Sequence, residues 1–189
     1  MLFRSPHVKA DYHLPLLPGS NVPLINAFSH VAVTEKLIDQ NYIDQRCDIE
    51  SFNDWKEFIS LDIHAPENVE TATGLNATQI RAAARLYASG KNSAIYYGLG
   101  VTEHSQGSTM VMGMANLAMA TGNVGSVGCG VNPLRGQNNV QGSCDMGSFP
   151  HELTGYQPIE NDILRGAFEK KWQVTIQKKP GMRSLNMFD

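Results

Sequence analysis

One short segment concentrates side chains that could bind a large polar ligand. Residues 131–147 read VNPLRGQNNVQGSCDMG and carry five side-chain amides, three glycines, one arginine and one aspartate. Amides donate and accept hydrogen bonds without adding charge, so a cluster of them suits a partner rich in donors and acceptors. A purine, a pterin, a ribose or a pyrophosphate would be such a partner. Arg135 is the single positive charge of the segment.

The sequence around this segment is almost without charge. From His104 to Cys144, Arg135 is the only formally charged residue. We expect a stretch so poor in charge to be largely buried, against other protein or against a ligand. A core without a ligand would not need five amides, because buried amides are costly unless each is hydrogen-bonded. The five amides are Asn132, Gln137, Asn138, Asn139 and Gln141.

A second candidate site is the sequence GLGVTEHSQG at residues 98–107. It follows an apolar run of strand-forming residues at 93–97 and precedes a helical pattern at 108–121. Open α/β folds place ligand phosphates at such a glycine-containing turn between a strand and a helix. An ordinary turn explains the same pattern, so this signal alone is weak. His104 fits an exposed loop, and we assign it no catalytic role.

The helix expected at 108–121 is apolar on all sides. Its four methionines are predicted to fill the core rather than to act chemically. They are Met110, Met112, Met114 and Met119.

Several further helices are expected to support these two sites. Ser20 is predicted to cap a helix over 22–35, and Ser51 to cap a short helix ending at Ile59. The apolar spacing of this short helix predicts a buried stripe. That stripe consists of Phe52, Trp55 and Phe58.

Two more helices have clear boundary residues. Pro66 is predicted to begin one helix and Gly74 to end it. Asn76 is predicted to cap the next helix over 77–88, in which alanines, Ile80 and Leu86 form a narrow packing face. Helices alternating with a strand pattern indicate an α/β fold.

Composition excludes several classes of protein. A hydrophobic share of 42% and a charged share of 17% fit a folded domain of 189 residues. The net charge of −3, without a basic tract, makes nucleic acid a poor partner. No apolar run reaches the roughly 18 residues of a membrane span. Cys47, Cys129 and Cys144 lie too far apart for a zinc or iron–sulfur motif and suggest reduced thiols of a cytoplasmic-type protein.

The segment at 131–147 resembles one in the large subunit of molybdenum- or tungsten-dependent formate dehydrogenases. GLGVTEH at 98–104 and NLAMATGNVG at 116–125 precede it in that family's order and spacing. ADYHL at 10–14, PGSNVPLINA at 18–27 and the block from Trp172 through KPGMRS at 179–184 are also similar. The resemblance thus runs over nearly the whole chain. The wider superfamily, which includes nitrate and sulfoxide reductases, shares the GNVG sequence that ends the helix. The sequence RGQNNVQG is more particular to the formate enzymes.

The resemblance implies an α/β architecture with two parts. Residues 1–136 would be the latter part of a Rossmann-like domain that binds molybdopterin guanine dinucleotide. Residues 137–189 would begin a neighbouring cofactor-binding α/β domain. The chain would then be a fragment of a larger subunit, whose other parts supply an iron–sulfur cluster, a cysteine or selenocysteine ligand to the metal, and a further domain that covers the pterin.

The implied activity is the reversible oxidation of formate to CO2 at a Mo or W atom held by two molybdopterin guanine dinucleotides. Arg135 matches the family's active-site arginine, which holds the formate carboxylate, and a planar guanidinium suits that two-point grip. No residue of this chain is assigned to the metal, and Cys144 is not its ligand. The positions implied to bind the cofactor are Leu99, Gly100 and Glu103 for one guanine dinucleotide, and Gly136, Gln137 and Asn139 for a pterin dinucleotide. Some relatives have glutamine where this chain has Glu103.

The implied partners are formate and CO2, together with electron-transfer subunits. Two alternatives remain open: another oxidoreductase of the superfamily, such as a nitrate reductase, and a metal-free module that binds a nucleotide or another protein. Arg135 within RGQNNVQG favours the formate enzyme over the nitrate reductase. A cytoplasmic location is favoured, with export left open.

Overall fold

The computed structural model describes residues 10–182 and 184–187, and the chain divides into two compact units. The first unit ends at Leu134 and the second begins at Arg135. This division falls two residues before the domain boundary expected from the sequence. The assignment of each part to a cofactor-binding domain stays a prediction, and residues 1–9, 183 and 188–189 of the predicted domains lie outside the described part.

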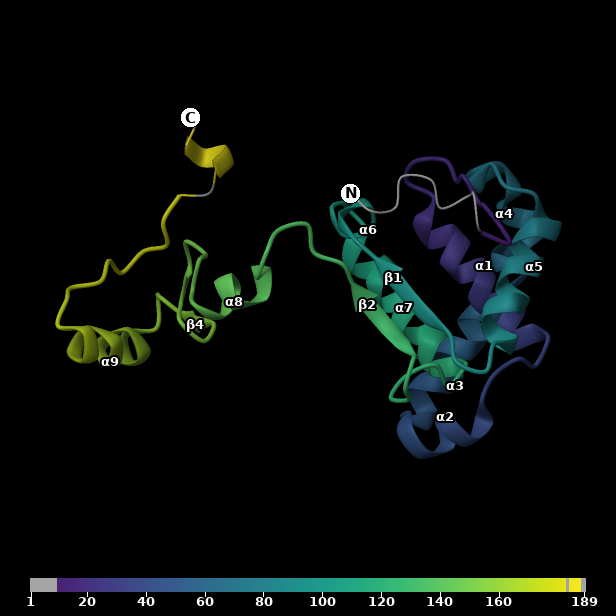
Figure 1. Ribbon diagram of the computed structural model, residues 1–189, viewed down its shortest axis with the longest axis horizontal. Helices are drawn as coiled ribbons and strands as arrows, with labels where there is room; N and C mark the ends of the chain where they lie inside the picture. The colour runs from purple at the N-terminus through teal and green to yellow at the C-terminus, as the bar shows by residue number, and fades with distance from the viewer. Residues whose placement is uncertain (1–9, 183, 188–189) are drawn as a thin grey trace. The chain divides into compact units, whose positions relative to one another are not determined.

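The first unit is built mainly from helices gathered around α1 (Figure 1). Helix α1 packs against α3, α4, α5 and α7. It is therefore buried on several sides, and Ala27, Val31 and Ala32 are fully inaccessible to solvent. The helices of this unit are α1 (Asn21–Thr34), α2 (Gln40–Arg46), α3 (Ile49–Ser60), α4 (Pro66–Thr73), α5 (Ala77–Ser89), α6 (Leu99–Thr102) and α7 (Gly107–Ala120), with the 3-10 turn η2 (Asp62–His64) before α4.

Two short parallel strands complete the first unit. Strand β1 (Ala94–Tyr97) pairs with β2 (Gly130–Pro133), with Ala94 opposite Gly130 and Tyr97 opposite Pro133. Helix α7 lies between the strands in sequence and packs against both (Figure 1). The strand–helix–strand connection confirms the predicted α/β class. Over residues 10–182 and 184–187, no helix is long and apolar enough to cross a membrane.

An ion-pair network joins the end of α1 to α4 and α5. Arg81 on α5 binds the Glu67 carboxylate through two hydrogen bonds of 2.8 and 2.7 Å and reaches Glu35 at 3.0 Å. Arg85, one turn further, also binds Glu35, at 2.6 Å. The Arg81 guanidinium lowers the pKa of Glu67 to about 2, and Arg85 lowers the pKa of Glu35.

The helix boundaries confirm several predictions. Helix α4 begins at Pro66, and its last residue, Thr73, is followed by the C-cap residue Gly74, which adopts the left-handed conformation with φ of 72°. Asn76 caps α5 by accepting the N–H of Thr78. Ser20 does occupy the N-cap of α1, but its hydroxyl donates to the Leu17 carbonyl and does not cap the helix.

The expectations for α3 and for one residue of α5 are wrong. Asp48, not Ser51, caps α3, because its carboxylate accepts the Ser51 N–H and so starts the helix earlier. The stripe of Phe52, Trp55 and Phe58 is not buried; Phe58 is 50% exposed, and Ile59 is the residue that packs inward. Leu86 on α5 is 52% exposed and borders an open pocket beside Asp11 and Tyr12.

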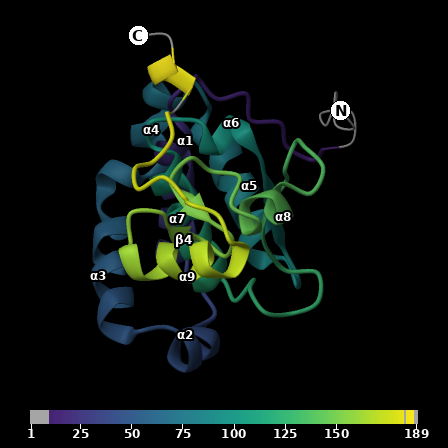
Figure 2. The same ribbon diagram turned by 90° about the vertical axis from the view of Figure 1, so that its left-hand side faces the viewer.

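The second unit is smaller and has its own elements (Figure 2). They are α8 (Val140–Asp145), the antiparallel pair β3 (Glu152–Leu153) and β4 (Gln157–Pro158), α9 (Asp162–Trp172) and the 3-10 turn η3 (Ser184–Met187). Asn161 caps α9 by accepting the N–H groups of Ile163 and Leu164. The buried Arg165 guanidinium donates to the Ile159 carbonyl and pairs with Asp162, which fixes α9 beside β4.

Candidate functional site

The carboxyl ends of β1 and β2 lie side by side. The Leu134 N–H donates to the Tyr97 carbonyl at 2.6 Å, and a Cβ on Gly98 would lie 3.3 Å from the Leu134 carbonyl oxygen. Open α/β folds bind ligands at this edge of the sheet. One group of predicted site residues, Leu99, Gly100 and Glu103, directly follows β1 at this edge.

These three residues lie on or immediately after the short helix α6. All three are exposed, and a Cβ added to Gly100 would meet nothing within 4 Å. The backbone of α6 is therefore open to close approach by a ligand. Gly107 has the opposite surroundings, because a Cβ there would overlap the Thr102 carbonyl. The absence of a side chain at Gly107 thus sets the tight junction between α6 and α7.

A polar cavity of about 170 Å³ opens beside α6. The beginnings of α1 and α7 both border it, and no carboxylate is among its lining residues. It is lined by Gly19, Asn21, Val22, Val101, His104, Ser105, Gln106 and Met110. His104 was expected to be an ordinary exposed loop residue, and this cavity was not predicted. The polar residues 103–106, which lie between Gly100 and Gly107, are the sequence feature that could have indicated this cavity.

The second group of predicted site residues opens the second unit. Arg135, Gly136, Gln137 and Asn139 are all exposed. Among the residues that the structure describes, Arg135 and Gln137 have no hydrogen-bond or ion-pair partner, and neither has Asn138. The segment therefore presents one unpaired cation and two free amides to solvent. The structure divides between Leu134 and Arg135, so each group of site residues is defined within its own unit.

Residues 104–144 were expected to be buried against other protein or against a ligand, and the described residues of this chain cover only part of that stretch. Residues 125–128 and 133–139 are exposed. They form the connections before and after β2, and within each described unit no element packs over them. A lack of charge does not bury a segment that has no surface to pack on.

Three of the five amides already have partners in the protein. The Asn132 amide donates to the Ile95 carbonyl at 3.2 Å and so bonds to the neighbouring strand. Asn139, at a φ of 51°, caps α8 by accepting the Gly142 N–H. Gln141 donates to Asp145 at 3.0 Å and to the Tyr156 hydroxyl at 2.7 Å. Protein groups thus supply partners for three of the five amides, and within the described residues Gln137 and Asn138 are the two that have none.

A polar cluster fixes α8 to the turn between β3 and β4. The Tyr156 hydroxyl donates to the Asp145 carboxylate at 2.7 Å, and the Gly155 N–H donates to the Asp145 carbonyl at 2.7 Å. The bond from Tyr156 lowers the pKa of Asp145 and raises that of Tyr156. The segment 135–139 is therefore anchored at Asn139, where it joins α8. The side chains of Arg135 and Gln137 have no partner among the described residues.

The methionines of α7 differ in their surroundings. Met114 lies in the core at 3% exposure, as predicted, together with Leu117. Met112 is 59% exposed, so the expectation for it is wrong. It lies on the face of α7 that the core does not cover.

The cysteines are unpaired and half-buried, as expected from their spacing. Burial raises the pKa of the Cys47 thiol. In the described part of the chain, no group of three or more His, Cys, Asp or Glu side chains could hold a metal ion.

The model of the molybdopterin oxidoreductase family matches residues 5–189. Formate dehydrogenase H of Escherichia coli (strain K12) is 45% identical over 165 residues, which is 87% of this chain and 22% of that protein. The F420-dependent formate dehydrogenase subunit alpha of Methanocaldococcus jannaschii is 40% identical over 180 residues, or 95% of this chain and 26% of that protein.

These relatives are much longer than the chain, which spans about a quarter of their length. Among solved structures, acetylene hydratase from Pelobacter acetylenicus is similar with a TM-score of 0.56 and 24% sequence identity. The similarity covers 60% of this chain and 15% of that one. At this identity it supports the fold alone.

Proposed function

The chain belongs to the molybdopterin oxidoreductase family, and from this premise we propose that it forms part of the catalytic subunit of a formate dehydrogenase, which oxidises formate to CO2 reversibly. The observation that carries the proposal is the unpaired, exposed Arg135 between strand β2 and the free amide of Gln137. A site for a small carboxylate needs a cation of this kind that no protein carboxylate already occupies. Membership of the family argues against a metal-free module.

The proposed cofactor is a Mo or W atom held by two molybdopterin guanine dinucleotides. Leu99, Gly100 and Glu103 would contact one guanine dinucleotide, and Gly136, Gln137 and Asn139 would line a pterin dinucleotide. Their surroundings fit such a group. The open backbone at Gly100 allows close approach, and the cavity beside α6 is polar and has no carboxylate to repel a pyrophosphate. The free amide of Gln137 can both donate to and accept from a pterin ring.

Arg135 would bind and orient the substrate. Its planar guanidinium can hold both formate oxygens, which leaves the C–H bond directed away from the arginine. Fixing one orientation lowers the entropic cost of reaching the transition state. The chemistry that the bound cofactor supplies is acceptance of the two electrons released when formate becomes CO2. An iron–sulfur cluster and electron-transfer subunits, outside this chain, are proposed to carry those electrons onward.

The anchored helix α8 would restrict the backbone that carries Arg135 and Gln137. The Asn139 side chain accepts the Gly142 N–H and the Asp145 carboxylate accepts the Tyr156 hydroxyl, and these bonds hold the C-terminal side of the segment. The side chains that precede Asn139 then remain free to bind a ligand. This arrangement would reduce the entropy lost on binding.

The activity can be tested on the purified enzyme that contains this chain. We expect formate-dependent reduction of a viologen dye, and no oxidation of the reduced dye by nitrate. The reverse result would support the nitrate reductase alternative and would overturn the proposal.

A further inference from the structure

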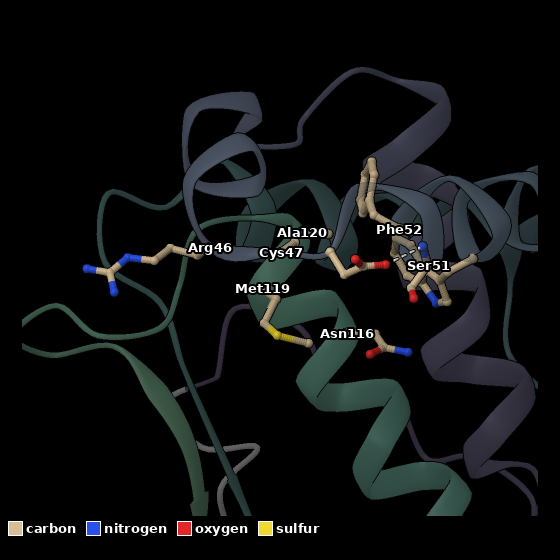
Figure 3. A pocket seen from close by; sticks show the side chains of 9 residues that line it. Arg46, Cys47, Ser51, Phe52, Asn116, Met119 and Ala120 are labelled. Atoms are coloured by element: carbon tan, nitrogen blue, oxygen red, sulfur yellow. Dashed lines mark hydrogen bonds between the residues drawn. The ribbon is translucent and has the colours of Figure 1, made fainter.

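Two side-chain amides outside the proposed site differ in their surroundings. Asn116 projects from α7 into a groove of about 220 Å³ between α3 and α7 (Figure 3), and it forms no hydrogen bond in the described part of the chain. The groove is mainly apolar, and no described residue indicates what would occupy it. Gln141 on α8, in contrast, uses its amide group in two hydrogen bonds. It lies two residues after Asn139, which is a proposed site residue.

Helix α8 is held by hydrogen bonds rather than by packing. None of its residues is buried. Among the residues that the structure describes, one hydrogen bond joins its first turn, residues 140–143, to the turn between β3 and β4. In that bond the Gln141 amide donates to the Tyr156 hydroxyl at 2.7 Å. The attachment of this end of α8 to the rest of the unit therefore depends on Tyr156.

The Tyr156 hydroxyl joins both ends of α8. While it accepts from Gln141, it donates to the carboxylate of Asp145, the last residue of α8, at 2.7 Å. Gln141 also donates to that carboxylate, at 3.0 Å, so the three side chains form a closed triangle. A phenolic hydroxyl both donates and accepts, and an amide group donates two hydrogen bonds, so these bonds are mutually compatible.

The backbone of Tyr156 has an uncommon conformation. Its φ of 60° lies in the left-handed region, which bulky residues rarely adopt. Such a conformation persists only where the surrounding structure compensates for it. Here the compensating contacts are the two bonds of the hydroxyl and the bond from the neighbouring Gly155 N–H to the Asp145 carbonyl, at 2.7 Å. All of them bind the turn to α8.

Helix α8 in turn restricts the segment that precedes it. Residues 135–139 lead directly into α8, and Asn139 caps this helix by accepting the Gly142 N–H. Arg135 and Gln137 bind no described residue, so their own side chains do not order this backbone. The C-terminal side of the segment is therefore ordered through α8.

From these contacts we propose that Tyr156 is a positioning residue of the proposed formate site. Its hydroxyl holds α8 through Gln141 and Asp145, and α8 holds the backbone that carries Arg135. Ordering this backbone before formate binds reduces the entropy lost on binding, so it strengthens substrate binding more than it speeds the chemical step that follows. The inference rests on the proposed function, because it takes Arg135 as the group that binds formate.

Steady-state kinetics of Tyr156→Phe in the purified whole enzyme test the inference. Phenylalanine keeps the ring and removes the hydroxyl, while the backbone bond from Gly155 to Asp145 remains. With rates normalised to metal content, we expect KM for formate to rise roughly fivefold, the effect of one lost hydrogen bond, and kcat to change by less than about twofold.

Tyr12→Phe is the matched control. Tyr12 is 45% exposed and Tyr156 is 46% exposed, but the Tyr12 hydroxyl forms no hydrogen bond with any described residue. Its removal should leave both KM and kcat unchanged. If Tyr156 served only to stabilise the fold, Tyr156→Phe would lower the melting temperature and leave the KM of the folded enzyme unchanged, which would overturn the inference.

A double-mutant cycle tests the route through Gln141. Gln141→Leu removes the donor to Tyr156 and should itself raise KM severalfold. Because both substitutions break the same contact, the double variant should have a KM close to that of Tyr156→Phe alone. Effects that multiply in the double variant would show that the two residues act independently and would contradict the proposed route.

Hydrogen exchange provides a measurement that does not need formate. The Gly142 and Ser143 N–H groups donate to Asn139 at the start of α8. Tyr156→Phe should lower their protection about fivefold in the whole enzyme, whereas Tyr12→Phe should not. Unchanged protection would overturn the inference. A wild-type enzyme that oxidised no formate would overturn the proposed function instead, and the exchange result alone would then decide whether Tyr156 orders this segment.

Discussion

Arg135 and Gln137 lie two residues apart in one exposed connection, yet the proposal gives them different partners. Arg135 would hold the substrate, and Gln137 would hold the cofactor. Neither side chain has a partner among the residues described here, so neither has a structural bond to lose on substitution. Changes at either position should therefore report on ligand binding rather than on folding.

We predict that Gln137→Ala lowers the metal and pterin content of the purified enzyme. The amide would otherwise be hydrogen-bonded to the cofactor, and such a bond contributes about 1 kcal/mol. Asn138→Ala is the matched control, because Asn138 is equally exposed and free but is not a predicted site residue. Metal analysis and pterin fluorescence of both variants check this prediction. Equal cofactor content in the two variants would contradict the role given to Gln137.

At the scale of elements, the turn formed by α6 and the start of α7 is defined by two glycines with contrasting surroundings. We predict that Gly107→Ala destabilises the enzyme by about 1–3 kcal/mol, because its Cβ would overlap the Thr102 carbonyl. Gly100→Ala should keep the melting temperature, since open space surrounds that position. It should nevertheless reduce cofactor content, because the added methyl group would block close approach to α6. If Gly100→Ala retained full cofactor content, the proposed contact at Gly100 would be wrong.

The ion pairs between α4 and α5 predict a dependence of local stability on pH. Arg81 lowers the pKa of Glu67 from 4.5 to about 2 in the folded protein. A carboxyl group whose pKa is depressed by folding stabilises the fold above its unfolded pKa, and this contribution is lost as pH falls from about 4.5 toward 2. The Glu67 side chain is 55% exposed, so solvent screening limits the contribution to about 1 kcal/mol.

Glu67→Gln should therefore lower the hydrogen-exchange protection of α4 and α5 amides about fivefold near neutral pH, and less as pH falls toward 3. Comparing variant and wild-type enzyme at each pH cancels the intrinsic pH dependence of exchange. A protection ratio that stayed constant down to pH 3 would show that Glu67 does not titrate against Arg81.

Local sequence signals predicted those elements whose boundaries are set by local chemistry. Pro66, Gly74 and Asn76 satisfy or remove backbone groups within their own helices, so their positions were predictable. Strand β2 was missed because four residues that include Pro133 carry little strand signal, and the pairing with β1 that defines them is made across 36 positions of sequence. The stripe of α3, which is half-buried at Phe52 and Trp55 and exposed at Phe58, was assigned to the core because periodicity shows which face of a helix is apolar, but not whether another element covers it.

The candidate site, like the fold, was predictable from the sequence only in part. The sequence indicated the cation and the free amide of Gln137, since their residue types are unusual in an almost uncharged stretch. It did not distinguish them from Asn132, Asn139 and Gln141, whose amides bond to other parts of the protein. Those bonds depend on the strand pairing and on the position of Tyr156, which no local pattern encodes.

At the scale of the whole molecule, apolar side chains remain exposed in both units. Val127 is 93% exposed, Ile163 85% and Met146 69%. The chain also spans only about a quarter of the length of its curated relatives. We predict that the isolated 189-residue chain self-associates and shows no formate-dependent dye reduction. Sedimentation velocity and a dye assay check this, and a monodisperse, active monomer would contradict it.

Arg135 is proposed to grip the formate carboxylate, and the steady-state kinetics of Arg135→Lys in the whole enzyme measure what that grip contributes. Lysine keeps the charge but loses the planar two-point grip. Losing a charge-assisted bond costs about 1.5–3 kcal/mol, so we predict that kcat/KM for formate falls roughly ten- to a hundredfold while the metal content stays normal. A variant with near-normal kcat/KM and full metal occupancy would show that Arg135 does not hold the substrate.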